Sequence, residues 1–495
     1  MYCRPISGAL LGSVVLVLSA CTTVPAPAGA AREIAVCERV FARVDAVVDE
    51  ARVRDVEAAR VAGFSYLRVT RFEASWRDEP AMPDGVFADA LAALDGRARG
   101  VELANLPAAV RRVLRDELAA EGMADPIDAT LDRCRERLLA RDRGDSTRRA
   151  LLRVNAHVAD NYSAAMRSFG VYPLSSLAFA RGIRGWQRDT QAVFATTLDL
   201  LPRHGVLTQF IPLRDEPIAA AELSALLVQA GSNRHWPEGV LERIAYAFAP
   251  VLTIDVVSND DRPGHPQHGS VPIDVREPVV FYRAAYARIG NTLHTQLVYT
   301  AWFPRRPKTG PLDILGGEID ALIWRVTLDT DGTPLVFDTI HACGCYHMFF
   351  PDPRLRSKPA PNNHEEFVFV PQTMPVLSQG ERVAVHIAAG THYVERVVAA
   401  SAVPHAGVPY RLVAEERLRS LPLDDLSGER RSWYGPDGLV AGSQRLERVL
   451  FWPMGIQSAG AMRQWGHHAT AFVGRRHFDD PWLIDHRFER LDSLR

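Results

Sequence analysis

The chain has 495 residues, of which 47% are hydrophobic and 23% are charged, and its net charge at neutral pH is −2. This composition is typical of folded globular proteins, and the length is sufficient for two or three domains. The chain has no excess of basic residues, which would indicate a polyanionic partner, so we expect no interaction with nucleic acid.

The first 20 residues have the layout of a secretory signal. A short start with one positive charge, Arg4, precedes an apolar run from about Gly8 to Leu18. Such a run is too short to span a bilayer comfortably as a permanent helix. At the end of this run, the four residues Leu18-Ser19-Ala20-Cys21 resemble the lipobox of bacterial lipoproteins. The resemblance implies cleavage before Cys21 and acylation of that cysteine.

Residues 21–31 resemble the tether of a lipoprotein, because CTTVPAPAGAA is rich in small residues and proline. Thr22, in place of aspartate, is the pattern that in many Gram-negative lipoproteins leads to the outer membrane. The resemblance therefore implies a cell-envelope protein facing the periplasm, with the bilayer as its partner through acylated Cys21. The alternative is a soluble signal peptide that is cut near Ala28 or Ala30.

Residues 32–240 are predicted to form a helical domain. Apolar residues at steps of three and four, such as Cys37, Val40 and Val44, draw one stripe along a helix, and Leu131, Cys134 and Leu138 repeat the pattern. Cys37 and Cys134 should both point inward. In an oxidising compartment they are a predicted disulfide, which the chain-entropy model values at about 4–5 kcal/mol. The alternative is two unpaired buried thiols.

Residues 241–495 are predicted to form a β-rich domain, because the hydrophobic period changes from 3.6 to 2 after about residue 250. Turn residues at Gly290-Asn291, Asp331-Gly332 and Ala389-Gly390 predict three hairpins. The fold class is therefore α+β, with a helical N-terminal domain followed by a mainly antiparallel C-terminal domain. Thirteen of the sixteen histidines belong to this second half.

The segment HACGCYH, 341–347, concentrates His341, Cys343, Cys345 and His347. An unbroken strand would place all four on one face but would separate the two histidines by roughly 20 Å. One metal ion cannot bind all four unless the chain turns, and Gly344 allows such a turn. The segment could then hold zinc, copper or iron through both cysteines and one histidine.

The ligand set of such a centre would need completion from another strand or by water. His294, His386 and His392 are the candidates for that ligand, and His294 lies on the neighbouring predicted hairpin. The same turn also admits a strained disulfide between Cys343 and Cys345, a thiol nucleophile activated by a histidine, or plain packing of the thiols.

Two carboxylates near a Gly-Gly pair, Glu318 and Asp320, are candidate catalytic bases or further ligands. The leading hypothesis is an envelope lipoprotein with a transition-metal site in its β-rich domain and a hydrolytic activity. The alternative is a non-catalytic scaffold or binding lipoprotein with a C-G-C disulfide or packed thiols.

Overall fold

The computed structural model describes residues 29–233, 236–237, 239–360, 365–378, 381–401, 407–423 and 427–491. The predicted signal, Cys21 and most of the predicted tether lie outside these residues. Within the described part of the chain, no helix has both the length and the apolar character needed to cross a bilayer.

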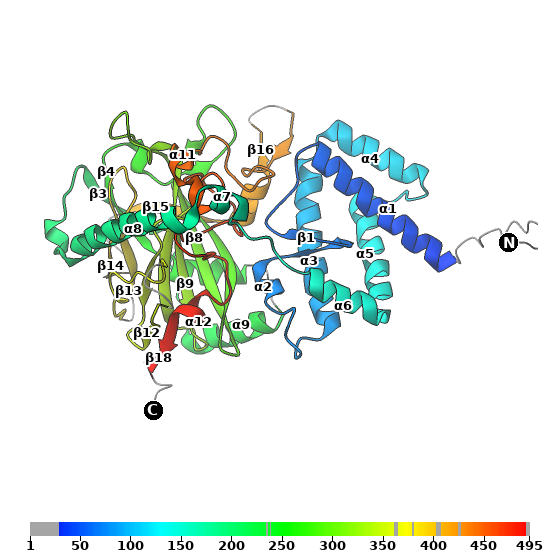
Figure 1. Ribbon diagram of the computed structural model, residues 1–495, viewed down its shortest axis with the longest axis horizontal. Coiled ribbons are helices and arrows are strands. Elements are labelled where there is room, and N and C mark those ends of the chain that lie inside the picture. Colours follow the sequence, from blue (N-terminus) through cyan, green and yellow to red (C-terminus); the bar gives the residue numbers. More distant parts are fainter. Residues whose placement is uncertain are drawn as a thin grey trace, which may run out of the picture.

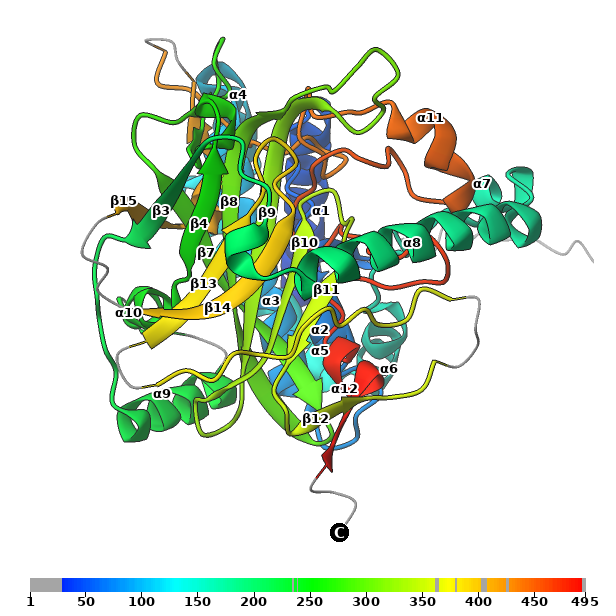
Figure 2. The ribbon, with the colours of Figure 1, turned by 90° about the vertical axis from the view of Figure 1, so that its left-hand side faces the viewer.

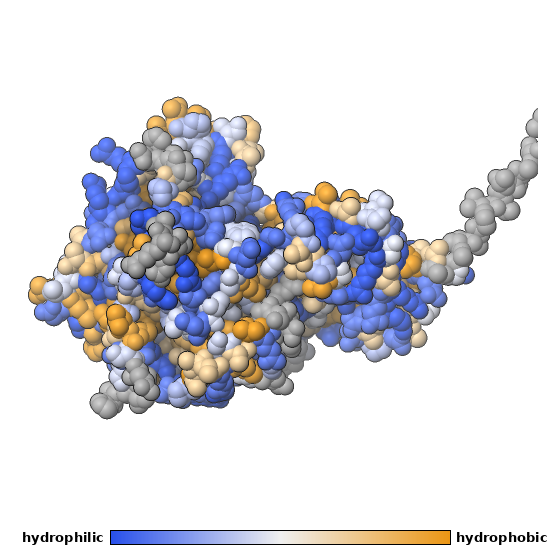
Figure 3. Space-filling view, turned by 90° about the horizontal axis from the view of Figure 1, so that it is seen from below, coloured by the Kyte–Doolittle hydropathy of each residue, from blue (hydrophilic) through white to orange (hydrophobic). Residues whose placement is uncertain are grey.

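The molecule has two lobes of unequal size, joined at a narrower waist (Figures 1 and 3). The smaller lobe is mainly helical, and its core consists of buried residues between Cys37 and Ala156. Its elements are α1 (Gly29–Glu50), β1 (Ala59–Val61), β2 (Phe64–Val69), α2 (Arg71–Ala74), α3 (Asp84–Asn105), α4 (Ala108–Ala120), α5 (Ile127–Gly144) and α6 (Ser146–Asn155).

The larger lobe is built on a ten-stranded sheet with the order β11-β10-β9-β8-β7-β15-β3-β4-β13-β14. Its strands are β3 (Val206–Pro212), β4 (Val251–Val256), β7 (Val279–Ile289), β8 (Thr292–Arg306), β9 (Gly317–Leu328), β10 (Pro334–His341), β11 (Met348–Pro351), β13 (Glu381–Ile387), β14 (Val394–Ser401) and β15 (Val408–Ala414). All the pairings are antiparallel except β13 with β4, and β15 with β3 and with β7.

Short elements complete the larger lobe. The helices are α7 (Ala164–Phe169), α8 (Tyr172–Ala195), α9 (Ala220–Asn233), α10 (Val240–Phe248), α11 (Glu447–Phe451), α12 (Leu483–Arg487) and the 3-10 turns η1 (Leu198–Leu200), η2 (Asn259–Asp261), η3 (Glu415–Arg419) and η4 (Trp452–Met454). The two-stranded pairs are β5 (His265–Pro266) with β6 (Ile273–Asp274), β12 (Leu355–Ser357) with β18 (Phe488–Arg490), and β16 (Leu421–Pro422) with β17 (Arg430–Arg431).

Both faces of the large sheet are covered, which explains why its strands are buried along most of their length. Side chains of α8, α9 and α10 pack on one face together with Trp324 and Phe337. The C-terminal segment covers the other face, where Met462 and Phe478 pack against Trp302. Figure 2 shows α8 lying across the strands, with α7 and α11 at its N-terminal end.

The predicted α+β class is confirmed, and so are the three predicted hairpins, which join β7 to β8, β9 to β10 and β13 to β14. The division between the two cores differs from the predicted boundary at residue 240. The helices α8 and α9 pack on the sheet, and the smaller core ends at Ala156. Periodicity identifies a helix but does not show which core the helix contacts.

Buried polar contacts join the two lobes at the waist. Arg419 binds Asp55 through its Nη2 at 2.5 Å, and Arg283 binds Glu57 at 2.9 Å. The Gln464 side-chain amide also donates to Asp55, at 3.0 Å. Since Asp55 and Arg419 are buried, these charges depend on one another for compensation.

Candidate functional site

The two cysteines of HACGCYH lie in a tight turn between β10 and β11. The strand β10 ends at His341, whose N–H donates to the carbonyl of Cys345 at 3.0 Å. The N–H of Gly344 donates to the carbonyl of His341 at 2.7 Å. The turn therefore folds the chain back within a few residues and brings the side chains of Cys343 and Cys345 to the same place.

Gly344 is required at the centre of this turn. Its φ of +94° is in the region that L-residues rarely adopt, as the sequence predicted for this position. A Cβ at this residue would also lie 2.3 Å from the carbonyl oxygen of Ala469. The C-terminal segment thus packs directly against the bend and leaves no space for a side chain.

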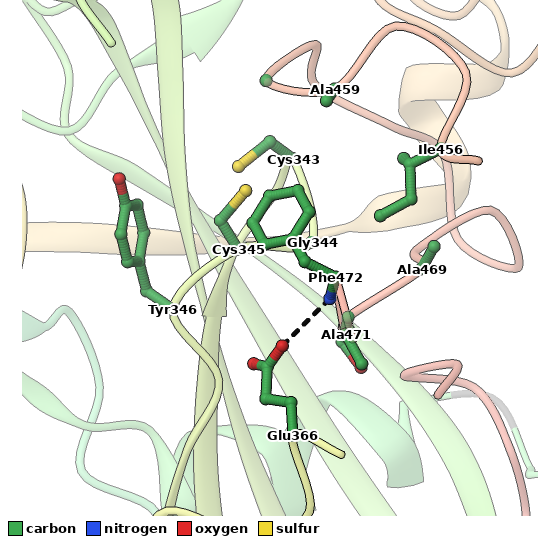
Figure 4. A pocket seen from close by; sticks show the side chains of 12 residues that line it. Cys343, Gly344, Cys345, Tyr346, Glu366, Ile456, Ala459, Ala469, Ala471 and Phe472 are labelled. Carbon is green, nitrogen blue, oxygen red and sulfur yellow. Dashed lines mark hydrogen bonds between the residues drawn. The ribbon is translucent and has the colours of Figure 1, made fainter. Parts of the chain in front are cut away.

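The thiols of Cys343 and Cys345 are unbonded and buried, with exposed fractions of 3% and 8%. Their sulfur atoms point toward each other (Figure 4). A hydrogen bond with Cys343, together with burial, holds the pKa of Cys345 well above its ordinary value. Cys345 therefore keeps its proton and donates it toward Cys343.

A small cavity of about 20 Å³ adjoins the thiols. Its walls come from the turn and from the C-terminal segment, including Ile456, Gly460 and Phe472, and Glu366 closes one side (Figure 4). The Glu366 carboxylate accepts a hydrogen bond from the N–H of Phe472 at 2.9 Å. A space of this size holds about one water-sized molecule.

Arg463 fixes the turn from the C-terminal segment. Its backbone N–H donates to the carbonyl of Ala342 at 2.9 Å, and its Nε donates to the carbonyl of Cys343 at 3.1 Å. Its Nη2 donates to the carbonyl oxygens of Gln457 and Ser458. Burial lowers the pKa of Arg463, and its attraction to the two cysteines acts in the opposite direction. A guanidinium in this position favours a thiolate.

Glu447 places an acidic group behind Gly460, one of the residues that line the cavity. One of its carboxyl oxygens lies against Gly460, so closely that a Cβ on that glycine would be 2.0 Å from it. Among the residues that the structure describes, the carboxyl makes no hydrogen bond or ion pair. Burial raises the pKa of Glu447 to about 7. A carboxyl with this pKa exchanges protons readily near neutral pH.

Asp320 organises the polar residues behind the turn. It is fully buried, accepts a hydrogen bond from Arg445 Nη2 at 2.9 Å and lies 2.7 Å from His392 Nδ1. Nδ1 of His341 lies 3.6 Å away from Asp320, and neither ring nitrogen of His341 has a hydrogen-bond partner among the described residues. Arg445 and the histidines hold the pKa of Asp320 well below its usual range despite burial.

Three residues with strained backbone gather at this site. Ile319, Tyr346 and His392 have φ values of +58°, +61° and +54° and are neither glycine nor asparagine. Ile319 precedes Asp320, Tyr346 follows Cys345, and the His392 ring contacts Asp320. Such strain persists where the surroundings fix the geometry, and it is concentrated at functional sites.

Other predicted site residues lie elsewhere. His347 is on the opposite side of the turn, where its Nε2 is 2.9 Å from Asp338, which also pairs with Arg325. Burial lowers the pKa of His347 to about 3. The bend at Gly344 is the physical reason, because it reverses the alternation that an unbroken strand would give to His341 and His347.

The remaining candidates are also separated from the thiols. His294 lies nine residues along β8 from Phe303, the partner of Asp320, a distance of roughly 30 Å in extended chain. His386 lines a different cavity with Asp255 and Glu395. Glu318 is largely exposed, 3.8 Å from Arg305. Of the three distant histidines, only His392 reaches the site, through Asp320.

Glu447, Arg463 and Arg445 were not anticipated from the sequence. They lie about a hundred residues after the turn, in a segment with little regular structure, so no periodic pattern connected them to Cys343. In contrast, the predicted bond between Cys37 and Cys134 is present and joins α1 to α5.

Within the described part of the chain, no three His, Cys, Asp or Glu side chains are arranged to hold a metal ion. Comparisons with known proteins give no relative: no family model, curated protein or solved structure matches the sequence. Functional inference therefore depends on the geometry of the site.

Proposed function

We propose that the chain is a membrane-anchored envelope lipoprotein whose β-rich lobe carries a redox-active dithiol, Cys343 and Cys345. Hydrogen peroxide, the smallest hydroperoxide, converts this pair to a disulfide. The observation that carries the proposal is the convergence of two buried, unbonded thiols beside a cavity of about 20 Å³. Membrane attachment follows from the lipobox-like residues before Cys21.

The chemistry begins at Cys343. Its thiol gives its proton to Glu447, and the thiolate attacks one oxygen of the peroxide, which forms a sulfenic acid and breaks the O–O bond. The leaving hydroxide takes the proton from Glu447 and departs as water. Cys345 then attacks the sulfenic sulfur, and a second water leaves. Two thiols and one hydrogen peroxide thus give one disulfide and two water molecules.

The reverse step requires a dithiol reductant. Its thiolate attacks the Cys343–Cys345 bond, and its second thiol resolves the mixed disulfide, so that the reductant leaves as a disulfide. A bond across a single intervening residue closes a small, strained ring, which makes it easily reduced. A reversible switch is therefore a better description of this pair than a structural crosslink.

Tryptic peptide mapping tests the proposal, because Cys343 and Cys345 are the only cysteines between Arg325 and Arg354. The folded protein is treated with hydrogen peroxide, denatured, alkylated and digested. We expect peptide 326–354 to lose two hydrogens and accept no alkyl group, whereas the untreated peptide accepts two. Cys345→Ser should instead accumulate the sulfenic acid of Cys343, which a dione reagent traps. Retention of two alkylated thiols after peroxide treatment would contradict the proposal.

A soft metal ion is a second candidate for the same thiols. The observation that favours it is the imidazole of His341, which is buried with no hydrogen-bond partner among the described residues. Thiolates with an imidazole select Cu(I) or Zn(II). Elemental analysis of untagged protein purified from the envelope distinguishes the two candidates. Stoichiometric metal that is lost in Cys343→Ser supports a metal centre, and metal-free protein with two free thiols supports the dithiol.

The geometry gives less support to hydrolysis by Glu318 and Asp320. Glu318 is largely exposed, and Asp320 is held ionised by Arg445 and His392. A carboxylate with a depressed pKa is a weak base. Asp320 is better suited to orienting the two histidines and Arg445.

A further inference from the structure

The helix α8 carries an exposed stripe that is apolar at its start and basic further along. Phe179, Trp186 and Phe194 point inward, where Phe179 packs on Phe451 and Trp186 packs on Tyr346. The outward stripe follows steps of three and four residues, which places its members on one side of the helix. These are Leu174, Leu177, Arg181, Arg184 and Arg188, all of them exposed.

The apolar end of the stripe continues onto neighbouring elements. Phe169, at the end of α7, is 82% exposed, and Leu174 is 69% exposed. The helix α11 lies at the same end of α8 (Figure 2), and Phe451 at its C-terminus contacts Phe179. The same helix, α11, adds the exposed side chains of Val449 and Leu450 to this apolar surface. Large apolar side chains gathered in this way mark interaction surfaces.

The basic part of the stripe consists of three arginines on the outward side of α8. Arg181, Arg184 and Arg188 make no hydrogen bond or ion pair with any residue in the described ranges. Together with Gln187, Gln191 and Phe369 they line an open hollow of about 630 Å³. Asp189 is the only acidic residue in α8. Three unpaired guanidinium groups around a hollow fit an anionic group such as a phosphate.

We propose that the α8 stripe docks onto an anionic phospholipid bilayer. Arg181, Arg184 and Arg188 bind phosphate headgroups, while Phe169, Leu174 and Leu177 enter the interface between headgroups and acyl chains. A surface helix with arginines on its outward face and adjoining large apolar residues has this mode of binding. The proposal does not depend on acylation of Cys21 or on the dithiol, because it concerns only the folded surface.

The net charge of the whole chain shows that binding to an anionic membrane must depend on the local arginines. The whole chain has a net charge of −2, so a general attraction to an anionic membrane is not expected. Binding to such a membrane must come from a local concentration of positive charge. It should therefore weaken as salt screens the arginines and should disappear when those three charges are removed.

The test is vesicle flotation with the chain from residue 21 onward carrying Cys21→Ser, so that no acyl chain contributes. We expect binding to vesicles that contain phosphatidylglycerol and little binding to vesicles of phosphatidylcholine alone. Changing Arg181, Arg184 and Arg188 to glutamine should lower the partition coefficient by roughly a hundredfold, since each basic residue near an anionic surface contributes about fivefold. Leu174→Ser with Leu177→Ser should lower it at both low and high salt.

A matched control removes three exposed arginines elsewhere, Arg32, Arg112 and Arg417, and should bind like the parent. Circular dichroism checks that each variant is folded. Equal, weak flotation with both vesicle types overturns the proposal, and so does undiminished binding by the three-arginine variant.

A competition experiment distinguishes a bilayer from a free phosphate. Inorganic phosphate competes if the arginines recognise the phosphate alone. If the protein leaves the vesicles only at phosphate concentrations far above that of the lipid, the result supports a bilayer as the ligand. If the protein leaves them at matched concentrations, the proposal of a bilayer is overturned.

Discussion

At the scale of single residues, the proposed chemistry makes Glu447 the group that sets the pH at which the dithiol reacts. Its pKa is raised to about 7 by burial, so the carboxylate that accepts the thiol proton is formed as pH rises through about 7. We expect the rate of thiol loss with peroxide to rise across this range. Glu447→Gln should lower the rate at pH 8 about tenfold or more and flatten the profile. Stopped-flow measurement of thiol loss gives the profile.

The control for this variant is Glu136→Gln, at an exposed position on α5 in the other lobe. It should leave the profile unchanged. If Glu447→Gln keeps the same midpoint near pH 7, another group accepts the proton and the role assigned to Glu447 is wrong.

Glu447 also affects stability, with a sign that follows from its raised pKa. In the folded protein the carboxyl stays protonated up to about pH 7, whereas an unfolded glutamate ionises near pH 4.5. Its contribution to stability is therefore fully present below pH 4.5 and is lost as pH rises to about 7. Glu447→Gln removes this loss. The free energy of unfolding of the variant, compared with that of the parent, should therefore be roughly 1–3 kcal/mol higher at pH 8 than at pH 5. Urea denaturation at the two pH values measures the difference, and an equal effect at both would contradict it.

Two features constrain Gly344, its positive φ and its contact with Ala469, and a comparison with a second glycine, Gly442, separates their costs. Gly344→Ala meets both the unfavourable φ and the carbonyl oxygen of Ala469, whereas Gly442, with φ of +83°, has no atom within 4 Å of an added Cβ. Gly442→Ala should cost about 1–2 kcal/mol, the value of the backbone conformation alone. Gly344→Ala should cost clearly more and should disturb thiol oxidation. Chemical denaturation compares them, and equal costs would mean that the contact with Ala469 relaxes freely.

At the scale of elements, the disulfide between Cys37 and Cys134 holds α1 against α5 in the smaller lobe. Both cysteines are fully buried in a well-packed core. Replacing both by serine should lower the free energy of unfolding by about 4–5 kcal/mol, because the bridge closes a loop of about a hundred residues. Thermal denaturation with and without reductant checks this. Reductant should destabilise the parent and leave the double variant unchanged.

The elements were predictable to the extent that periodicity specifies them. The apolar stripes of α1 and α5 placed Cys37 and Cys134 inward, and turn residues located three hairpins. The short strands β1 and β2 were missed, because a few residues cannot show a period. The position of α8 on the sheet was also missed, since the stripe that contains Trp186 has no mark that distinguishes one core from the other.

At the scale of the whole molecule, the buried pair of Arg419 with Asp55 connects the two lobes. Arg419→Met should leave a buried carboxylate without its partner and cost about 3–5 kcal/mol. The exposed pair of Arg411 with Glu277 serves as the control, and Arg411→Met should hardly change stability. Calorimetry should show the lobes unfolding in separate transitions only in the Arg419 variant. A single, unshifted transition would mean that the waist is held by other contacts.

The site itself was only half predictable, because it is assembled from distant parts of the chain. The turn at Gly344 and the convergence of Cys343 and Cys345 followed from residue types and strand geometry. Glu447 and Arg463 come from the C-terminal segment, whose path over the sheet depends on the complete fold. His347 was one of the two histidines considered as a third ligand after a turn at Gly344, but the turn places it beside Asp338 instead.

The central claim is that Cys343 and Cys345 interconvert between dithiol and disulfide in the folded protein. Its most direct test is the mass of peptide 326–354 followed through one cycle of peroxide and then dithiothreitol. We predict a loss of two hydrogens on oxidation and their complete return on reduction, with the Cys37–Cys134 bond intact throughout. Two alkylated thiols at every stage, or an irreversible gain of oxygen, would contradict the account.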